Sequence, residues 1–344
     1  MGNTAHATEV HRGVTFGFYR RRGEWETDEC RREIDRMTEL GINWVCVVPT
    51  IMMETPTEPR QFADFENTPG DLELAETIEL IHEKGMKVHL RPMIECWDGN
   101  ARLEVTFPPD RPGSRIPGLV SDKWERWFRG MRARTKHYAK IAQRFGCEMY
   151  GLDSEIDSFV HRHREWREVL DVARSVYDGP VTSSHTHRVD FIKELQNADH
   201  WFRDLDCLGT SYYHPGEAEA GWSVEQMVEY MQPVRDMYRE MARLLGKPIM
   251  FGECGCTSST AGATHPSGWQ GDGVYDPDEQ ANYMKAVIRL FAEEPWWAGL
   301  YWWKWDENNV RPQFINDPAG DKGFTIYGKT AGDVMKQWCA RGDR

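Results

Sequence analysis

The sequence has no long hydrophobic run. No stretch approaches the ~20 consecutive apolar residues that a membrane-spanning helix needs, so we expect no membrane partner. The first six residues, Met1 to His6, contain no apolar core of the kind that marks a secretory signal. We therefore expect a cytoplasmic protein, or a secreted one if a signal peptide preceded this sequence and was removed.

Cysteine is sparse and irregularly spaced. The eight cysteines are scattered through the predicted strands and helices, without the regular spacing of a disulfide-rich domain. This pattern indicates reduced thiols. Cys254 and Cys256 lie close together, but no second pair accompanies them, so they are only a weak signal for zinc.

Positive charge is also in short supply. Lys and Arg number 42 against 55 Asp and Glu, which gives a formal net charge of −13. Binding to nucleic acid requires clustered basic side chains, and the basic runs at 20–22 and 132–134 are short enough to be solvated surface. We expect no nucleic-acid partner, and neutral or cationic substrates suit this charge better. The chain also lacks a Gly-rich phosphate loop after a predicted strand, which counts against a two-domain dinucleotide-binding fold.

What the sequence does contain is a repeated alternation of short apolar strands and segments with helical periodicity. The strands are predicted to begin near Gly13, Ile42, Met86, Cys147, Pro180, Leu205, Pro248 and Ala298. The helices are predicted near 27–40, 71–84, 121–145, 163–177, 188–200, 223–245, 277–294 and 330–340. Strands that alternate with helices run parallel. The pattern predicts an α/β fold, a (β/α)₈ TIM barrel, in which residues 1–344 form a single catalytic domain and residues 1–11 a flexible tail.

The predicted connections differ in length on the two faces of this barrel. Turns from helix to strand are short and contain glycine, as in Leu40-Gly41-Ile42 and Phe145-Gly146-Cys147. Connections from strand to helix are longer, at about 49–70, 94–120, 213–222, 254–276 and 305–329. TIM barrels build their active sites from the loops that follow the strands. Functional residues are therefore expected on the face with the long loops.

Two glutamates close predicted strands on that face. Glu155 ends the fourth strand and Glu253 ends the seventh, and in an eight-stranded barrel these strand ends lie across the mouth from each other. Two carboxylates that face one cleft are what hydrolysis of a glycosidic bond requires, and a retaining enzyme holds them roughly 5–5.5 Å apart. Either glutamate alone could be a cap or an ion-pair partner, but both together favour catalysis.

Aromatic residues gather on the same predicted face. Trp97 follows the third strand, Tyr213 follows the sixth, and Trp303 and Trp305 belong to the eighth. Flat rings of this kind suit the apolar CH faces of sugars. Because adjacent residues of a strand point in opposite directions, one of Trp302 and Trp303 is expected in the core.

Histidines offer a competing interpretation. His185 and His187 end the fifth strand, but the first strand, at 13–18, supplies no ligand that would complete a metal-dependent hydrolase. His185 is predicted instead to hydrogen-bond a sugar or a catalytic carboxylate. The polar loop 306–309 could hold a cation, although an ordinary surface loop is the simpler interpretation. We expect no metal and no cofactor.

With these residues in place, the chain resembles the retaining glycoside hydrolases of clan A, most closely family 113, known for β-1,4-mannanases. The resemblance runs through Arg12–Thr15, Leu40–Val45, Val48–Thr50, Glu83–Val88, Leu90–Pro92, Trp302–Trp305 and Lys322–Lys329. It implies that Glu155 is the acid/base and Glu253 the nucleophile. It also implies that Tyr213 hydrogen-bonds the nucleophile and that Trp303 lies beneath the sugar at subsite −1.

Two positions depart from the pattern of that family. Ser154 stands where most of clan A has the Asn that holds the sugar 2-hydroxyl. Arg91-Pro92 stands where Lys-Pro is expected, and a guanidinium differs from an ammonium in geometry, so it can select a different substrate group. We expect Ser154 and Arg91 to contact the substrate in altered ways.

The resemblance predicts double displacement, with Glu253 attacking and Glu155 first donating and then removing a proton. Near neutral pH Glu155 must then be protonated and Glu253 ionised, and hydrogen bonds from Tyr213 are expected to lower the pKa of Glu253. The expected partner is an oligosaccharide or polysaccharide, bound by a monomer or homodimer. The alternatives are another clan-A activity (exo-β-mannosidase, glucanase or xylanase), a non-catalytic carbohydrate-binding barrel, and a metal-dependent hydrolase.

Overall fold

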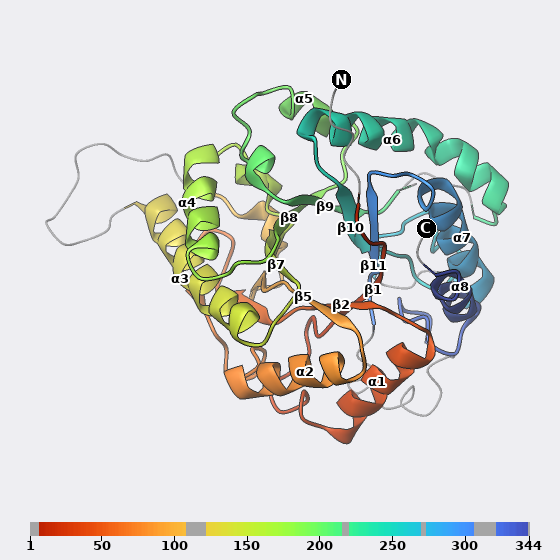
Figure 1. Cartoon of the computed structure of the whole chain (residues 1–344), viewed down its shortest axis with the longest axis horizontal. Coiled ribbons are helices and arrows are strands. Elements are labelled where there is room, and N and C mark those ends of the chain that lie inside the picture. Colours follow the sequence, from red (N-terminus) through yellow and green to blue (C-terminus); the bar gives the residue numbers. More distant parts are fainter. Residues whose placement is uncertain (1–6, 108–121, 215–219, 270–272, 306–320, 343–344) are drawn as a thin grey trace, which may run out of the picture.

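A closed barrel of parallel strands forms the centre of the molecule (Figure 1). The computed structural model describes residues 7–107, 122–214, 220–269, 273–305 and 321–342. In chain order the barrel strands are β1 (His11–Phe16), β2 (Trp44–Val47), β5 (Lys87–Leu90), β7 (Met149–Ser154), β8 (Val181–Thr186), β9 (Cys207–Tyr212), β10 (Ile249–Cys254) and β11 (Trp297–Trp302). Each pairs in parallel with its neighbours, and β11 closes the ring on β1. The predicted (β/α)₈ TIM barrel is confirmed.

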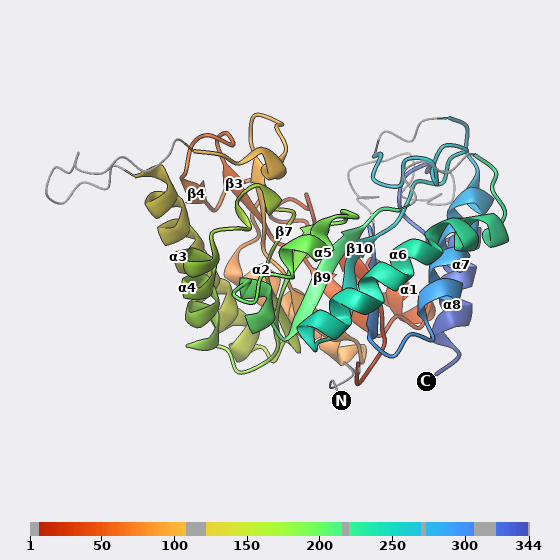
Figure 2. The same ribbon diagram turned by 90° about the horizontal axis from the view of Figure 1, so that it is seen from above.

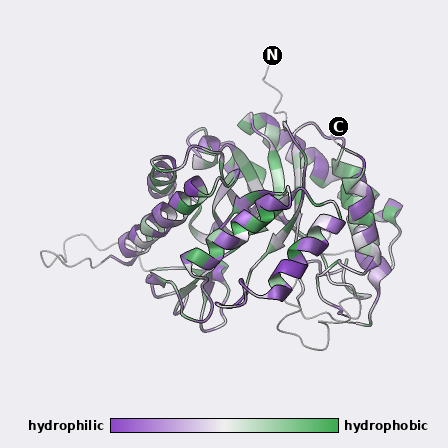
Figure 3. Ribbon diagram, turned by 60° about the horizontal axis from the view of Figure 1, so that its bottom comes forward, coloured by the Kyte–Doolittle hydropathy of each residue, from purple (hydrophilic) through white to green (hydrophobic). Residues whose placement is uncertain are grey.

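Helices form the outer layer around this barrel (Figure 1). They are α1 (Asp28–Glu39), α2 (Asp71–Glu83), α3 (Lys123–Arg144), α4 (His163–Arg174), α5 (Phe191–Glu194), α6 (Val224–Leu245), α7 (Pro277–Phe291) and α8 (Thr330–Cys339). Several begin where a side chain caps the free N–H groups of the first turn: Ser223 caps α6 and forms a capping box with Gln226. Hydrophilic and hydrophobic residues alternate along the outer helices (Figure 3), as expected for helices with one buried face.

Two of the long loops contain an additional small sheet that periodicity does not reveal. β3 (Thr50–Met53) pairs with β4 (Gln61–Phe62) and with β6 (Met93–Cys96). β3 and β4 stand beyond the ends of the barrel strands, on the side where the long loops lie (Figure 2). Strands of two to four residues are too short to show alternation, so these segments were predicted as loops.

Two further predictions differ from the structure. The helix predicted at 188–200 is helical only at α5, followed by a 3₁₀ turn, η3 (Trp201–Asp204). Asn197 Oδ1 accepts a hydrogen bond from the Asp199 N–H at 3.0 Å, which turns the chain out of the helix. His11 was placed in a flexible tail, but it belongs to β1 and stacks on Trp44 with ring centroids 4.0 Å apart.

The core has two parts, separated by the strands themselves. Val45 and Val47 of β2 face the helices and join the larger hydrophobic cluster, whereas Trp44 and Cys46 point into the barrel and join the smaller one. This alternation follows from the two-residue period of a strand. All eight cysteines are free thiols, in agreement with the sequence pattern. Within the described ranges, every helix is too short or too polar to cross a membrane.

Candidate active site

Each of the two glutamates is delivered to the barrel mouth by a local irregularity of its strand. In β7, Leu152 packs in the outer cluster and Asp153 pairs with Arg134 of α3, so two consecutive residues face outward. The register with β8 shifts between Gly151 and Ser154, which turns Ser154 inward. Bulges of this kind re-aim side chains next to active sites.

The second irregularity lies in β10, where the register with β9 shifts between Phe251 and Glu253. Phe251 packs outward, whereas both Gly252 and Glu253 face the interior. A Cβ at Gly252 would lie 2.3 Å from the Oγ of Ser184 in β8, so only glycine leaves room for that side chain inside the barrel. The bulge places the carboxylate of Glu253 inside the mouth.

Glu155 follows β7 directly and adopts an unusual backbone conformation. Its φ of 58° lies in the left-handed region, which costs a residue with a side chain of order 1 kcal/mol or more. Its backbone N–H donates to Ser184 O at 3.3 Å. Strained conformations of this kind persist where the surrounding structure enforces them, and they cluster at functional sites.

Three donors converge on Glu253. The Nη2 of Arg91 lies 3.2 Å from Oε1, the hydroxyl of Ser154 donates to Oε1 at 2.9 Å, and the hydroxyl of Tyr213 donates to Oε2 at 3.0 Å. Burial and the carboxylate of Glu155 raise the pKa of Glu253, against the opposing influence of Arg91 and Arg102. The expected lowering of this pKa is therefore wrong, because desolvation outweighs the hydrogen bonds.

The two glutamates are linked by one guanidinium nitrogen. Nη2 of Arg102 lies 2.7 Å from Glu155 Oε2 and 3.9 Å from Glu253 Oε1. The two oxygens can be no farther apart than these distances laid end to end. That limit accommodates the roughly 5–5.5 Å of retaining enzymes and reaches only the lower edge of the roughly 6.5–9.5 Å of inverting ones.

Arg91 and Ser154 both contact the carboxylate of Glu253. Neither side chain is exposed to solvent. Arg91 also donates to Gly252 O at 3.1 Å and lies 3.4 Å from Ser184 Oγ. Both residues hold the carboxylate of Glu253. Their contacts with a substrate stay predictions.

Trp303 and Trp97 were predicted to contact the sugar, and the two rings differ in exposure. Trp303 belongs to the inner cluster, packs 4.9 Å from Phe18 and is only 9% exposed. Trp302 packs in the outer cluster and donates to Phe324 O, so it is the core member of the pair. Trp97 follows β6 and is 60% exposed.

His185 and Trp305 were predicted to contact the substrate, and the structure buries both side chains. Ser184 faces the barrel interior, so His185, the next residue of β8, points outward and stacks on Phe191 at 4.0 Å. Burial lowers the pKa of His185 to about 4. Trp305 is buried in the outer cluster, 6.0 Å from Tyr327. Position near a strand end does not reveal which side of the barrel a residue faces.

Sequence reasoning missed Arg102, Glu95 and Tyr19. Arg102 opens a short 3₁₀ turn, η1 (Arg102–Glu104), in the long loop after β6. Glu95, in β6, forms an ion pair with Arg102 Nη1 and accepts a hydrogen bond from the Tyr19 hydroxyl at 3.1 Å. Loop residues carry no periodicity, so only the length of that loop pointed to this region.

Metal ligands are not assembled in the described part of the chain. No group of three or more His, Cys, Asp or Glu side chains there could hold a metal ion. The polar loop 306–309 lies outside the described residues. What the site does assemble is a pair of carboxylates among hydrogen-bond donors, which is suited to proton transfer and nucleophilic attack.

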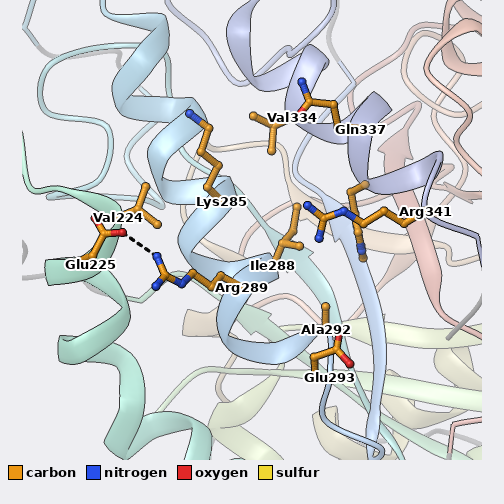
Figure 4. A pocket seen from close by; sticks show the side chains of 11 residues that line it. Val224, Glu225, Lys285, Ile288, Arg289, Ala292, Glu293, Val334, Gln337 and Arg341 are labelled. Carbon is orange, nitrogen blue, oxygen red and sulfur yellow. Dashed lines mark hydrogen bonds and ion pairs between the residues drawn. The ribbon is translucent and has the colours of Figure 1, made fainter.

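A cavity of about 600 Å³ lies elsewhere, on the outer surface between α6, α7 and α8 (Figure 4). Its apolar lining includes Val224, Ile288 and Val334, and the ion pair between Glu225 and Arg289 spans it at 2.6 Å. All of its lining residues belong to these three helices or to the segments that follow α7 and α8. It is therefore separate from the barrel mouth.

Comparison with known proteins identifies the kind of protein to which this site belongs. The sequence model of Glycoside Hydrolase Family 113 matches residues 14–329. The solved structure of the family 113 β-mannanase AaManA from Alicyclobacillus acidocaldarius, in complex with ManMIm, is 30% identical and has a TM-score of 0.80. It covers 97% of this chain and 98% of its own.

Two further structures extend the comparison. A family 113 β-1,4-mannanase is 26% identical with a TM-score of 0.80 and covers 97% of this chain and 100% of its own. A glycoside hydrolase family 5 mannosidase from Rhizomucor miehei is 15% identical with a TM-score of 0.58, and covers 96% of this chain and 92% of its own. This last likeness shows the fold alone. None of the curated proteins matches the chain.

Proposed function

Since the chain belongs to glycoside hydrolase family 113 and is therefore a glycoside hydrolase, we propose that it cleaves β-1,4-mannosidic linkages in mannan or manno-oligosaccharides. Two structures that cover nearly the whole chain are a β-mannanase and a β-1,4-mannanase. In this proposal the reaction retains the anomeric configuration, with Glu155 as acid/base and Glu253 as nucleophile.

In the first step, a carboxylate oxygen of Glu253 attacks the anomeric carbon and forms a glycosyl ester. The bond from that carbon to the leaving oxygen breaks, and Glu155 transfers its proton to this oxygen. Tyr213 suits its part as a donor, because burial and the nearby Glu253 raise the pKa of its hydroxyl well above the usual value and keep the proton in place.

In the second step, Glu155 removes a proton from water, and the water oxygen attacks the anomeric carbon. The ester bond to Glu253 breaks and regenerates its carboxylate. Arg91 and the Ser154 hydroxyl hold the oxygen Oε1, while Tyr213 holds Oε2. These contacts fix the direction in which the carboxylate can attack, which is the main benefit of preorganisation.

Aromatic side chains supply the remaining contacts to the sugar in this proposal. Trp303 lies beside Phe18 in the inner cluster and is assigned to the sugar at the cleavage point. The exposed ring of Trp97 is assigned to a neighbouring sugar unit. An apolar face offered to a pyranose ring contributes affinity without requiring a particular hydroxyl pattern.

The observation that carries the proposal is the convergence of three separate segments on Glu253, together with the link through Arg102 to Glu155. A capping or surface glutamate would not collect buried donors from three parts of the barrel. A nucleophilic carboxylate must be held in one orientation, and donors from three segments hold Glu253 in this way.

The test is hydrolysis of β-1,4-mannohexaose with the anomer of the new reducing end followed by NMR. We expect β-configured products before mutarotation. With an activated aryl β-mannoside, azide should rescue Glu155→Ala by forming the β-azide and Glu253→Ala by forming the α-azide, since each variant leaves room on one face. Products of inverted configuration, or a variant at either position that keeps near-native rates, would contradict the assignment.

A further inference from the structure

The guanidinium of Arg102 is held on three sides. Its Nε donates to the backbone carbonyl of Ser154 at 3.2 Å, its Nη1 pairs with Glu95, and its Nη2 donates to Glu155 at 2.7 Å. The side chain is 9% exposed. A planar guanidinium with fixed partners at each nitrogen presents a rigid donor to the last of them.

Arg91 and Arg102 divide the two glutamates between them. Arg91 lies 3.2 Å from Glu253. Arg102 lies 2.7 Å from Glu155 and 3.9 Å from Glu253. The carboxylate assigned to proton transfer is thus oriented chiefly by an arginine from a loop, and the attacking carboxylate by an arginine that follows a barrel strand.

Charge balance makes this division necessary. Glu95, Glu155 and Glu253 bring three carboxyl groups into one buried cluster with two guanidinium groups. With one carboxyl proton the cluster is neutral. Burial opposes the charge of Arg102, but Glu155 and Glu95 outweigh it and raise the pKa of Arg102, so the guanidinium stays charged. Without the charge of Arg102, the negative charges of neighbouring carboxylates would face each other in a site of low dielectric constant.

Other titratable or charged groups surround this cluster. Asp153 is paired with Arg134. Tyr19 donates to Glu95, and Lys304 Nζ lies 5.8 Å from the ring centroid of Phe18. Burial raises the pKa of Cys96 to about 12, so this thiol stays neutral.

We propose that Arg102, anchored by Glu95, is a positioning residue that holds the carboxyl group of Glu155 in its proton-transfer geometry beside Glu253. The inference rests on the proposed function, because it takes Glu155 as the acid/base. It adds to that function a pair of residues, Arg102 from the loop after β6 and Glu95 from β6 itself, that act through Glu155.

The first experiment compares two substrates that differ in their need for proton donation. Mannohexaose has a poor leaving group, whereas a dinitrophenyl β-mannoside needs no acid. For Arg102→Met we expect kcat/KM for mannohexaose to fall on the order of 10²–10⁴-fold. The loss for the aryl substrate should stay below roughly tenfold, because only attack by Glu253 is then required. A structural defect would instead lower both by the same factor.

The second readout is the pH profile. Arg102 is one of the groups that lower the pKa of Glu253, so its removal should raise that pKa further. The acidic limb of kcat/KM, which reports ionisation of the nucleophile in the free enzyme, should move to higher pH by on the order of one unit. Arg102→Lys keeps the positive charge but loses the planar pair of guanidinium N–H groups, so it should shift the acidic limb of kcat/KM less.

Two further variants separate positioning from folding. Glu95→Gln does not touch either catalytic glutamate, yet it should reproduce the substrate-dependent loss in weaker form, because Arg102 loses its anchor. Arg203→Met is the matched control: Arg203 donates to three backbone carbonyls, of Asn197, Leu195 and Leu244, near the opposite end of the barrel. It should affect both substrates equally. If Arg102→Met fails to fold, Arg102→Lys and Glu95→Gln carry the test.

A double-mutant cycle completes the test. In a Glu155→Ala background, Arg102→Met has nothing left to position and should cost less than about threefold on mannohexaose. A full additive loss, or equal losses on both substrates, would overturn the inference. If Glu155→Ala still behaves as the acid/base variant, with azide rescue, only the inference about Arg102 fails. If Glu155→Ala cleaves mannohexaose normally, the proposed function fails first.

Discussion

The interior of the barrel is filled differently at its two ends, although both ends exclude water. Near the beginning of the strands, His11 is stacked on Trp44 and lies 3.0 Å from the Tyr301 hydroxyl. Near the opposite end, the completely buried guanidinium of Arg91 contacts Glu253, which is 1% exposed. One end is aromatic and neutral, and the other is charged.

This difference shows how burial acts on ionisable groups with and without partners. Burial, with a smaller contribution from Lys87, lowers the pKa of His11 to about 3, so the ring stays neutral. Burial and Arg91 also lower the pKa of His89, a residue of β5 whose ring lies 5.2 Å from that of Tyr301, well below its ordinary value. At the mouth, guanidinium groups compensate the carboxylates and keep charge inside the protein. The end of the barrel near the beginning of the strands, around His11 and Trp44, is called the floor below. The floor therefore serves stability, and the mouth keeps charges available for chemistry.

The largest expected effect comes from removing the carboxylate at the mouth. Glu253→Gln should lower kcat on manno-oligosaccharides by roughly 10⁴-fold or more, since an amide cannot form the glycosyl ester. The amide oxygen still accepts hydrogen bonds, so the fold should persist. Steady-state kinetics with thermal unfolding as a companion measurement checks this. His11→Gln, at the floor, should keep near-native kcat, and equal losses in both variants would remove the distinction between the two ends.

The next effect concerns the compensation of charge. Arg91→Met leaves Glu253 buried beside Glu155 without its nearest cation, which should destabilise the fold by about 3–5 kcal/mol at neutral pH. Because loss of Arg91 raises the pKa of Glu253 further, the carboxyl group takes up a proton more readily as pH falls. The destabilisation should therefore shrink toward acidic pH.

Denaturant titration of this variant at several pH values measures the effect directly. Arg91→Lys is the control, since it keeps the charge but cannot make the bonds to both Gly252 O and Glu253. We expect it to recover part of the lost stability. A deficit that is the same at every pH would mean that packing, and not charge, explains the loss.

The comparison also shows how far the sequence could predict this protein. The barrel strands were found within two residues of their observed starts, because alternation with helices leaves a strong periodic signal. Glu155 and Glu253 were found because a strand end is visible in the sequence. What could not be seen is the direction of a side chain at that strand end.

Direction depends on bulges and on single-residue parity. Ser154 faces inward only because Leu152 and Asp153 both face outward, and this irregularity has no signature in residue type. In β8, His185 points outward by simple alternation, since the preceding Ser184 takes the inward position. Arg102 and Glu95 meet only because a long loop folds around the small sheet. The strands of that sheet have two to four residues, which is too short to leave a periodic signal in the sequence.

The smallest expected effect belongs to the floor and separates stability from catalysis. The folded state holds His11 neutral with a pKa of about 3, whereas the unfolded chain protonates this ring near pH 6.5. Between these two values the unfolded state binds more protons, so stability falls as pH falls through that window, by up to about 1.4 kcal/mol per pH unit for this residue. His11→Gln cannot titrate, and its free energy of unfolding should decline less steeply between pH 6.5 and 4.5. His185→Gln, which replaces another buried neutral histidine, should change the slope in the same direction.

Parallel stability curves for wild type and His11→Gln would show that the floor is not responsible. The pH dependence of kcat/KM should be unchanged in both variants, because it is set at the other end of the barrel, where charge is retained by pairing.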